Sequence, residues 1–485
     1  MAETSILSRY PEYEVTIGIE VHAQLTTNSK IFCFCSNGPA QEPNTNICPI
    51  CTGYPGVLPL LNKEVVNHAI MTGLATKCTI NPHSEFARKH YFYPDLPKNY
   101  QITQSDKHIC QNGSVTIRLE DGSAKKIRIM RIHMEEDAGK NMHSPHSNES
   151  FVDLNRTGTP LLEIVTQPDI SSSYEAKAYL KALRSIVMYL DVCSGNMEEG
   201  AFRADTNISV KKKTDTKLGT RCELKNINSF KFIGDAIEYE IERQITMLES
   251  GQKIRQETRL WDTKERKTIL MRSKEEAADY RYLPDPDIRP LYVDEAWIAS
   301  IKSRMPELPD EKYDRLQKEY GLSAYEAEIL INDQDVADYF IQAAQETTSK
   351  LLINWVLRDV MGFIKEHKIS LAEFKITPHI LAELVNLVDN NTINARIAQD
   401  VFAAVAKTGE SPRAYVKKHS LEQVEDTQEL ERIIHEIVAS NPQQAADYKA
   451  GKEKLWGFFV GQAMAKTKGK GNPQKIQELL KKALQ

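Results

Sequence analysis

Alternating apolar and polar residues predict a strand over residues 15–24, near the start of the chain. Its apolar positions fall on one face, which is formed by Val15, Ile17, Ile19 and Val21. The opposite face carries Glu20 and His22, about 7 Å apart at the usual rise of about 3.3 Å per residue. A carboxylate and an imidazole on one face of a strand can share a cation.

A second strand, predicted over 125–134, continues its apolar row into a charged residue. Met130, Ile132 and Met134 alternate, and Glu136 follows them in the same phase. Its carboxylate should point toward the residues against which this row packs, where it needs either a proton or a cation. A charged loop just beyond the strand end is the alternative interpretation.

Two further strands carry acidic residues in unusual settings. Glu163 lies within the apolar run 160–165, which is typical of a strand covered on both faces. Asp205 lies on the polar face of a strand over 203–210. A single residue of this kind is usually part of a solvated surface. Four such strands in one sheet-rich region predict a cluster of carboxylates and a histidine around a divalent cation.

Helical periodicity appears in three stretches of the first 293 residues, at 63–77, 173–190 and 236–248. Strands are expected between them around 115–120, 125–134, 160–166, 205–210 and 220–226. Hairpin signals outnumber helical crossovers, so this region is predicted to be α+β with a mostly antiparallel sheet.

A proline-dense stretch at 284–290 marks a domain boundary, and beyond it the chain becomes helical. Ser323 and Glu326 form a capping-box pattern that opens one of these helices. Helix breaks are expected near 369–377, 408–412 and 440–443. We therefore expect three domains, at 1–293, 294–411 and 412–485.

Composition and charge narrow the class of protein. The chain of 485 residues is 41% hydrophobic and 27% charged, with a net charge of −5, which is ordinary for a globular protein of two or three domains. The N-terminus is polar, which is not typical of a signal peptide, and no apolar run is long enough for a membrane span. We therefore expect a cytoplasmic protein. Mild acidity disfavours a simple cationic nucleic-acid binder, although local basic patches can hold RNA. The sequence contains no phosphate-binding P-loop, dinucleotide-binding glycine motif, nucleophile elbow or H-E-x-x-H motif.

Four of the eight cysteines have the spacing of a metal site. They form the pattern C-x-C-x12-C-x2-C and are Cys33, Cys35, Cys48 and Cys51. Two close pairs of this kind are typical of structural zinc held by four thiolates, here within the loop 30–55. Disulfides are the alternative, which a reducing cytosol disfavours.

Two aromatic segments, 90–97 and 280–287, echo each other by placing aromatic residues beside Pro-Asp turns and basic residues. Aromatic rings next to cations suit the ends of single-stranded nucleic acid, whereas aromatic residues that anchor a turn are the alternative. The candidates in the first segment are Arg88, Lys89, Tyr91 and Tyr93.

The C-terminal stretch is rich in lysine. A loop over 466–473 offers Lys466, Lys468 and Lys470 as candidates for contacts with RNA phosphates. A solvated basic tail is the alternative.

With these motifs in place, the sequence resembles the family of B subunits of the tRNA-dependent aspartyl/glutamyl amidotransferases. The resemblance covers almost the whole chain and rests on long motifs: IGIEVHAQL at 17–25, YPGVLPLLN at 54–62, RKHYFYPDLPKNYQI at 88–102, RIHMEEDAGK at 131–140, VDLNRTGTPLLEIV at 152–165, MEEGAFRADTNIS at 197–209, ELKNINSF at 223–230 and DYRYLPDPD at 279–287. The four zinc-site cysteines occur in only part of that family.

The resemblance implies a glutamine-hydrolysing ligase in which a kinase-like step phosphorylates, with ATP, the side-chain carboxylate of Glu on tRNA(Gln) or Asp on tRNA(Asn). Ammonia from a partner amidase, the A subunit, then displaces phosphate, and a small C subunit completes a heterotrimer. The resemblance also implies that 1–293 is a catalytic cradle domain and that 412–485 is a tail that binds tRNA, while Arg88, Lys89, Tyr91 and Tyr93 become candidates for its acceptor end.

The resemblance further implies the residues of the site. Glu20, His22, Glu136 and Glu163 are expected to hold Mg²⁺, and Asp205 joins them as a catalytic residue. Histidine is an uncommon ligand for an ion that prefers oxygen, so the identity of the metal comes from the family. Two other classes compete with this interpretation: a metallohydrolase that acts alone, which would not need the basic tail, and a non-catalytic tRNA-binding module, which would not need buried Glu136 and Glu163.

Overall fold

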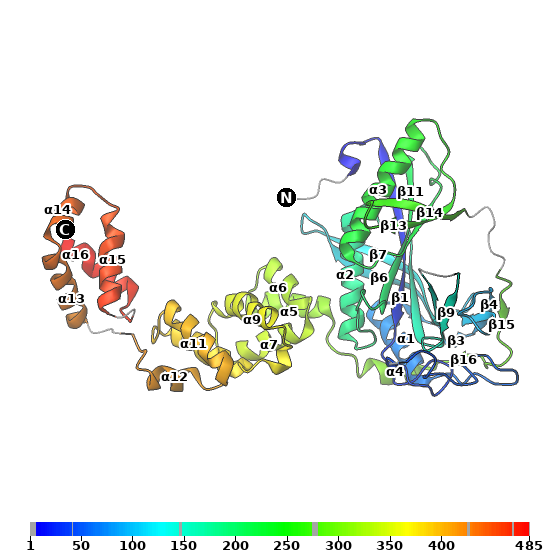
Figure 1. Ribbon diagram of the computed structural model, residues 1–485, viewed down its shortest axis with the longest axis horizontal. Helices are drawn as coiled ribbons and strands as arrows, with labels where there is room; N and C mark the ends of the chain where they lie inside the picture. The colour runs from blue at the N-terminus through cyan, green and yellow to red at the C-terminus, as the bar shows by residue number, and fades with distance from the viewer. Residues whose placement is uncertain are drawn as a thin grey trace. The chain divides into compact units, whose positions relative to one another are not determined.

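The computed structural model describes residues 6–40, 42–144, 148–273, 280–423, 427–467 and 470–484. The chain divides into two compact units, Met1–Glu311 and Lys312–Gln485. The first unit contains the strands, and the second is helical (Figure 1).

A nine-stranded sheet forms the body of the first unit, in the order β14-β13-β12-β11-β1-β10-β7-β6-β2. Its neighbouring strands are antiparallel except for β12 and β13, which run parallel. The bounds are β1 Tyr13–Gln24, β2 Thr79–Ile80, β6 Cys110–Arg118, β7 Ala124–Glu136, β10 Pro160–Thr166, β11 Phe202–Lys212, β12 Cys222–Lys225, β13 Glu257–Asp262 and β14 Lys267–Ser273.

Three helices cover one face of this sheet: α1 Lys63–Ala75, α2 Ser173–Tyr189 and α3 Phe230–Glu249 (Figure 1). Their first turns are capped by the side chains of Asn62, Ser172 and Ser229, each of which accepts a backbone N–H. Such caps typically contribute about 0.5–2 kcal/mol each. The alternate residues of β1, including Ile17 and Ile19, pack beneath these helices in one hydrophobic core. The polar residues of β1 therefore face the other side of the sheet.

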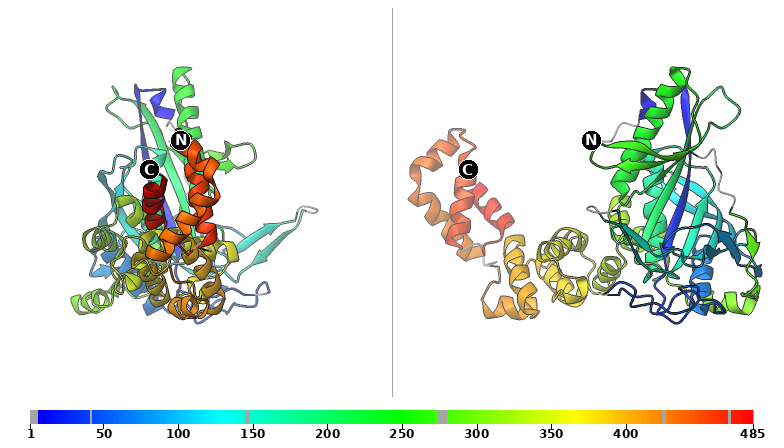
Figure 2. Two further views of the ribbon diagram at one scale, coloured as in Figure 1. Left: turned by 90° about the vertical axis from the view of Figure 1, so that its left-hand side faces the viewer. Right: turned by 45° about the vertical axis from the view of Figure 1, so that its right-hand side comes forward.

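Short strands beside the large sheet bring distant segments together. One small sheet has the order β15-β4-β5 and another pairs β16 with β3, while β8 and β9 form a hairpin that extends away from the large sheet (Figure 2, left). Their bounds are β3 His83–Ser84, β4 Ala87–His90, β5 Tyr100–Thr103, β8 Lys140–His143, β9 Ser150–Asp153, β15 Leu283–Pro284 and β16 Leu291–Tyr292. Helix α4, Glu295–Lys302, packs on α1, and the short 3-10 helix η1, Ile6–Ser8, lies near α3.

The second unit has two hydrophobic cores, one built from residues between Tyr313 and Val416 and one from residues between Leu430 and Leu484. Its helices, of which α5 begins at the unit boundary, are α5 Pro309–Tyr320, α6 Ala324–Ile331, α7 Gln334–Ala344, α8 Leu352–Asn354, the π-helical turn η2 Trp355–Val360, α9 Met361–His367, η3 Leu371–Glu373, α10 Pro378–Asp389, α11 Ala395–Thr408, α12 Pro412–Lys418, α13 Thr427–Ser440, α14 Pro442–Lys449, α15 Leu455–Lys466 and α16 Pro473–Leu484.

The α+β class and the mostly antiparallel sheet are confirmed. The capping box of Ser323 and Glu326 is also present, with both of its reciprocal hydrogen bonds. The boundary expected at 293 differs from the division into units, because the apolar side of α4, with Ile301, belongs to the core of the first unit. The division at 411 stays a prediction. Across the described ranges, no helix is both long enough and apolar enough to cross a lipid bilayer.

Candidate functional site

The face of the large sheet opposite the helices carries rows of polar side chains. His22 of β1 is the direct partner of Glu163 of β10, and Glu163 is in turn the partner of His133 of β7. In the neighbouring row, Glu20 of β1 pairs with Asp205 of β11. Direct partners on antiparallel strands point to the same face, so strand register alone gathers these residues.

His22, Glu135 and Glu163 form the core of the site. The Nε2 atom of His22 lies 3.6 Å from Glu135 Oε1 and 3.4 Å from Glu163 Oε2. One ligand atom from each of the three residues lies within 4.8 Å of the others, close enough to share a metal ion. Glu135 is 3% exposed and also accepts a hydrogen bond from Thr103 Oγ1 at 3.2 Å. Two carboxylates and an imidazole can therefore converge on one divalent cation.

A second imidazole, that of His133, contacts both carboxylates. Its Nε2 atom lies 3.4 Å from Glu163 Oε2 and 3.7 Å from Glu135 Oε2. Burial disfavours the charged imidazole, but the negative charges of Glu163 and Glu135 outweigh burial and raise the pKa of His133 to about 9. Burial also opposes protonation of His22, yet its hydrogen bond with Glu163 raises its pKa. At neutral pH the proton on His133 therefore places a positive charge beside both carboxylates.

The electrostatics of the carboxylates differ along this face. Burial raises the pKa of Glu163, but His133 and His22 outweigh burial and hold that pKa well below its ordinary value. The pKa of Glu20 is instead raised, first by burial and then by repulsion from Glu163. Glu20 accepts a hydrogen bond from Asn207 Nδ2 at 3.1 Å, and Asp205 accepts one from Lys225 Nζ at 2.5 Å. Glu20 and Asp205 therefore lie beside the cluster, and each accepts a hydrogen bond from a residue outside it.

Glu136 lies on the other face of β7. Its carboxylate is 1% exposed, forms an ion pair with Lys98 Nζ, and accepts a hydrogen bond from Ile102 N at 2.9 Å. The burial and the pairing with a cation agree with the sequence prediction, but the expected convergence with His22 does not occur in this geometry. Successive strand side chains point to opposite faces, so Glu135 takes that place. A catalytic role for Glu136 stays a prediction.

The carboxylate cluster opens into a pocket of about 890 Å³. Basic and acidic side chains line this pocket together: the basic ones are Lys89, Lys140, Arg156, Arg203 and Lys225, and the acidic ones are Glu135, Asp137, Glu198, Glu199 and Asp205. Asp137 holds two of the basic side chains, since its Oδ2 atom lies 2.9 Å from Arg203 Nη2 and 3.5 Å from Arg156 Nε. Carboxylates that can share a cation and guanidinium and ammonium groups in the same pocket suit a ligand with phosphate groups.

Sequence reasoning missed His133, Glu135, Asp137, Arg156, Arg203 and Lys225. A signal for the first two existed, because His133 and Glu135 alternate out of phase with the apolar row that ends at Met134. That phase places them on the polar face of the sheet. The other residues depend on pairing between strands far apart in sequence.

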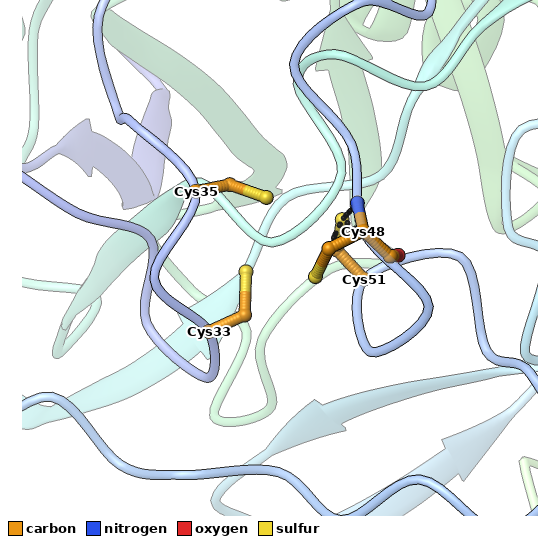
Figure 3. Close-up of side chains that lie close together, drawn as sticks. All are labelled: Cys33, Cys35, Cys48 and Cys51. Atoms are coloured by element: carbon orange, nitrogen blue, oxygen red, sulfur yellow. Dashed lines mark hydrogen bonds between the residues drawn. The ribbon is translucent and has the colours of Figure 1, made fainter.

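The four predicted metal-site cysteines do come together. Cys33 and Cys35 on one loop point toward Cys48 and Cys51 on another (Figure 3). Their sulfur atoms all lie within 4.8 Å of one another, and the Sγ atoms of Cys48 and Cys51 are 3.9 Å apart. Tetrahedral zinc with bonds of about 2.3 Å places its sulfur ligands about 3.8 Å apart, so the donor set fits zinc.

A fully buried ammonium group lies beside these thiols. Lys30 is 0% exposed, and its Nζ atom donates to Asn46 O at 2.9 Å and lies 3.8 Å from Cys51 Sγ. The pKa of Cys51 is lowered to about 5, first by its contact with Cys33 and further by hydrogen bonds from Cys48 and the charge of Lys30. One thiolate of the four is therefore already favoured without metal.

The residues predicted to contact RNA have different surroundings. Arg88 is held by Asp285 and Asp287 through hydrogen bonds of 2.9 and 2.8 Å, whereas Lys89 and Tyr91 line the large pocket. Tyr93 is 58% exposed.

In the C-terminal stretch, Lys466 forms an ion pair with Glu436, and Lys470 Nζ donates to Ser420 O at 2.5 Å. Lys468 lies outside the described residues. RNA binding by these residues stays a prediction.

Comparison with known proteins gives one consistent result. Residues 15–299 match the family described as the GatB/GatE catalytic domain, and residues 338–484 match the family described as the GatB domain. The chain is 52% identical over 479 residues to the B subunit of the aspartyl/glutamyl-tRNA(Asn/Gln) amidotransferase of Geotalea daltonii, a match that covers 98% of this chain and 100% of that protein. The proteins of the same name from Thermodesulfovibrio yellowstonii and Myxococcus xanthus are 50% and 51% identical, each over 98% of this chain and 99% of the relative.

Proposed function

The chain belongs to the GatB/GatE family, and from that premise we propose that it uses ATP to activate the side-chain carboxylate of a misacylated tRNA for amidation. The substrates are Glu-tRNA(Gln), Asp-tRNA(Asn) or both, as the name of its relatives supports. The observation that carries the proposal is the cluster of His22, Glu135 and Glu163, of which His22 and Glu135 line a pocket that also contains five basic side chains.

The chemistry requires an activation step, because an unactivated carboxylate would have to expel oxide. A carboxylate oxygen of the aminoacyl side chain attacks the γ-phosphorus of ATP, ADP leaves, and an acyl phosphate forms. Ammonia then attacks the acyl carbon, phosphate leaves, and the nitrogen loses a proton to give the amide. Both reactants of the first step are anions, so their charge has to be neutralised and their oxygens held in line.

The residues of the cluster fit a divalent cation. Its two carboxylates are the kind of ligand that Mg²⁺ prefers, and His22 adds an imidazole nitrogen. When bound, Mg²⁺ would neutralise charge on the phosphate oxygens. Glu135 is fixed by Thr103, and Glu163 by its position between two imidazoles, so both carboxylates are oriented before a ligand arrives.

The walls of the pocket have a separate role in the proposal. Arg156 and Arg203, both held by Asp137, and Lys225, held by Asp205, present positive charge to phosphate groups. Asp205 then acts as a positioning residue, because it contacts Lys225 and lies outside the three-residue cluster. Glu20, the strand partner of Asp205, has a raised pKa and is proposed as a further ligand for the ion.

We propose that ammonia comes from a partner amidase, the A subunit, and that the small C subunit completes the complex. The relatives are named as one lettered subunit of an amidotransferase, which supports an enzyme of several chains. Zinc at Cys33, Cys35, Cys48 and Cys51 is structural in this proposal, since four thiolates complete its coordination and leave no open position for substrate. The basic residues of 412–485 add affinity for tRNA.

The proposal is tested with the assembled complex, free ammonia, ATP and Glu-tRNA(Gln), so that the glutaminase step is bypassed. Glu163→Gln keeps the shape of the side chain but removes its charge, and it should lower the rate of amidation by about 10²–10⁴. Glu242→Gln is the matched control, because Glu242 lies on α3 in an exposed ion pair with Arg9 and surface pairs contribute little. Near wild-type amidation by the Glu163 variant would contradict the proposal.

A further inference from the structure

Two aromatic segments that are far apart in sequence are joined beside the large sheet of the first unit. Strand β4 pairs with β15, with Arg88 opposite Leu283. The N–H of His90 donates to Tyr280 O at 2.8 Å, and its Nδ1 atom lies 3.0 Å from Arg281 O. Arg88 adds ion pairs to Asp285 and Asp287, so the two segments are fixed to each other by both backbone and side chains.

This pairing gathers four tyrosine rings. The ring centroids of Tyr93 and Tyr91 are 6.1 Å apart, those of Tyr91 and Tyr280 are 6.3 Å apart, and those of Tyr280 and Tyr282 are 6.0 Å apart. Each contact is edge-to-face, with interplanar angles between 67° and 75°. We call these four residues the tyrosine platform. Tyr93 and Tyr282, at its ends, are 58% and 47% exposed, so ring surface is available to a ligand.

A cation lies against the middle of the platform. Lys89 Nζ lies 5.0 Å from the ring centre of Tyr280 and 5.9 Å from that of Tyr91. Burial disfavours its charge, but Glu135 and other anionic neighbours outweigh burial and raise the pKa of Lys89. Lys89 therefore stays charged and links the platform to the carboxylate cluster.

We propose that the tyrosine platform stacks the terminal base of the tRNA acceptor end, with Tyr280 and Tyr282 of the second segment as essential parts of that surface. This inference rests on the proposed function. Flat aromatic faces beside a cation suit an unpaired nucleobase, whose π-face stacks on tyrosine irrespective of sequence.

The position of the platform favours the terminal nucleotide over others. Lys89 and Tyr91 line the same pocket of about 890 Å³ as His22 and Glu135. The amino acid is esterified to the terminal ribose, so its side-chain carboxylate can reach the cluster only when the terminal nucleotide is held at this pocket. Stacking on the platform would fix the position of the terminal base, and the cluster would fix the position of the side-chain carboxylate.

The test combines changes in the protein with a change in the RNA. Binding of deacylated tRNA(Gln) by the assembled complex is measured with intact RNA and with RNA that lacks the terminal adenosine. One stacked base contributes about 1–3 kcal/mol to affinity, or about 5- to 150-fold, so removal of the adenosine should weaken wild-type binding by roughly tenfold. Tyr282→Leu should bind intact tRNA about tenfold more weakly and should lose nothing further when the adenosine is removed.

Matched variants separate stacking from structure. Tyr282→Phe keeps the ring and should restore wild-type behaviour. Tyr292→Leu removes an exposed tyrosine that contacts His83, outside the platform, and should keep the full effect of the terminal adenosine. Tyr280→Leu should reproduce Tyr282→Leu, and the exposed position of Tyr282 keeps the test valid if the Tyr280 variant folds poorly.

Two results would overturn the inference. In the first, the effects of Tyr282→Leu and of adenosine removal are additive, which means that the two groups do not interact. In the second, the Kd for ATP rises in Tyr282→Leu while the effect of the terminal adenosine is unchanged, which assigns the stacking to the adenine of ATP. Because the measurement is of equilibrium binding, it decides this inference even if the complex fails to amidate.

Discussion

Glu135 and Glu136 are neighbours in the chain with opposite surroundings, and this permits a closely matched pair of substitutions. Glu135→Gln removes a charge from the cluster, where His22 Nε2 lies at 3.6 Å and His133 Nε2 at 3.7 Å. Glu136→Gln removes a charge that is paired with Lys98 on the other face of β7. Each variant changes the same atoms, so any difference between them comes from location.

The magnitudes follow from these contacts. At an effective dielectric constant of about 20, a unit charge 3.6 Å from another interacts with it by about 4–5 kcal/mol before the cost of desolvation. Loss of one partner from a buried pair typically costs about 3–5 kcal/mol. We therefore expect Glu135→Gln to weaken the binding of a divalent cation by at least about a hundredfold and to lower amidation by about 10²–10⁴.

Glu136→Gln should act mainly on stability. The ammonium of Lys98, whose side chain is 8% exposed, would lose its partner, at a cost of about 3–5 kcal/mol. For a unit of this size that corresponds to a fall in Tm of about 5–10 °C. The cation site on the other face would remain intact.

The assay is thermal unfolding with and without Mg²⁺, together with amidation driven by free ammonia. Mg²⁺ should raise the Tm of the wild type and of Glu136→Gln by similar amounts and should leave that of Glu135→Gln unchanged. If Glu136→Gln loses the response to Mg²⁺ and Glu135→Gln keeps it, the assignment of Glu135 to the ion is refuted.

Three further outcomes are expected. In metal-free protein the proton on His133, whose pKa is about 9, stabilises the fold fully below its unfolded pKa of about 6.5, and this contribution is lost as pH rises through about 9. Because that proton competes with the ion, the rise in Tm caused by Mg²⁺ should grow between about pH 7 and pH 9. A rise in Tm that does not change with pH would contradict the competition. A buried cation beside Cys51 Sγ offsets the negative charge of four thiolates, so the Lys30→Met protein should release zinc to a chelator faster than wild type. The Lys30→Arg protein keeps the cation and should release zinc at close to the wild-type rate. Equal rates for the two variants would contradict this role. Deletion of 427–485, which leaves α12 and its Val416 in the core of residues 313–416, should raise the KM for tRNA and weaken the salt dependence of binding while glutaminase activity of the complex survives. Unchanged tRNA affinity would show that the basic residues are only a solvated surface.

Local periodicity was sufficient to predict much of the fold and part of the site. The alternation in β1 places His22 on the polar face and Ile19 in the core, because the side-chain period of a strand does not depend on its partners. The spacing of the four cysteines predicted their convergence for a similar reason, since short loops fix which side chains can meet. In both cases the signal lies within a short stretch of chain.

Glu136 shows the limit of prediction from local periodicity. Glu136 shares the buried face of β7 with Ile132 and Met134, as predicted, but Met130, the first residue of the predicted row, is 36% exposed, because the alternation changes phase where the register with β10 shifts. The step that failed was to join a residue from the apolar row with His22, which comes from a polar row. Successive side chains of a strand leave on opposite faces of the sheet, so Glu136, which contacts Lys98 and Ile102, points away from the face that carries His22. His133 and Glu135 are in phase with Ile127 and Ile129, which are buried in the core, so a period of two over the whole strand would not have selected them. The alternation changes phase at Met130, where the register with β10 shifts.

The walls of the pocket could not have been predicted from local pattern. Asp137, just beyond the end of β7, contacts Arg203 of β11, and Asp205 of β11 contacts Lys225 of the neighbouring β12, so both ion pairs join segments that only the folded sheet brings together. The same register gives β7 two distinct neighbourhoods at its end. Glu135 faces the larger pocket, whereas Glu136 and Lys98 line a smaller pocket of about 240 Å³ against the cysteine loop, where a Cβ on Gly53 would come within 2.5 Å of Lys98 Cγ. Gly53 has a φ of +70° and leaves no room for a side chain, so the cysteine loop holds Lys98 in place through backbone contact. Cys33 and Cys51 line this smaller pocket as well, so the cysteine site lies on the Glu136 side of β7, apart from Glu135 and the larger pocket.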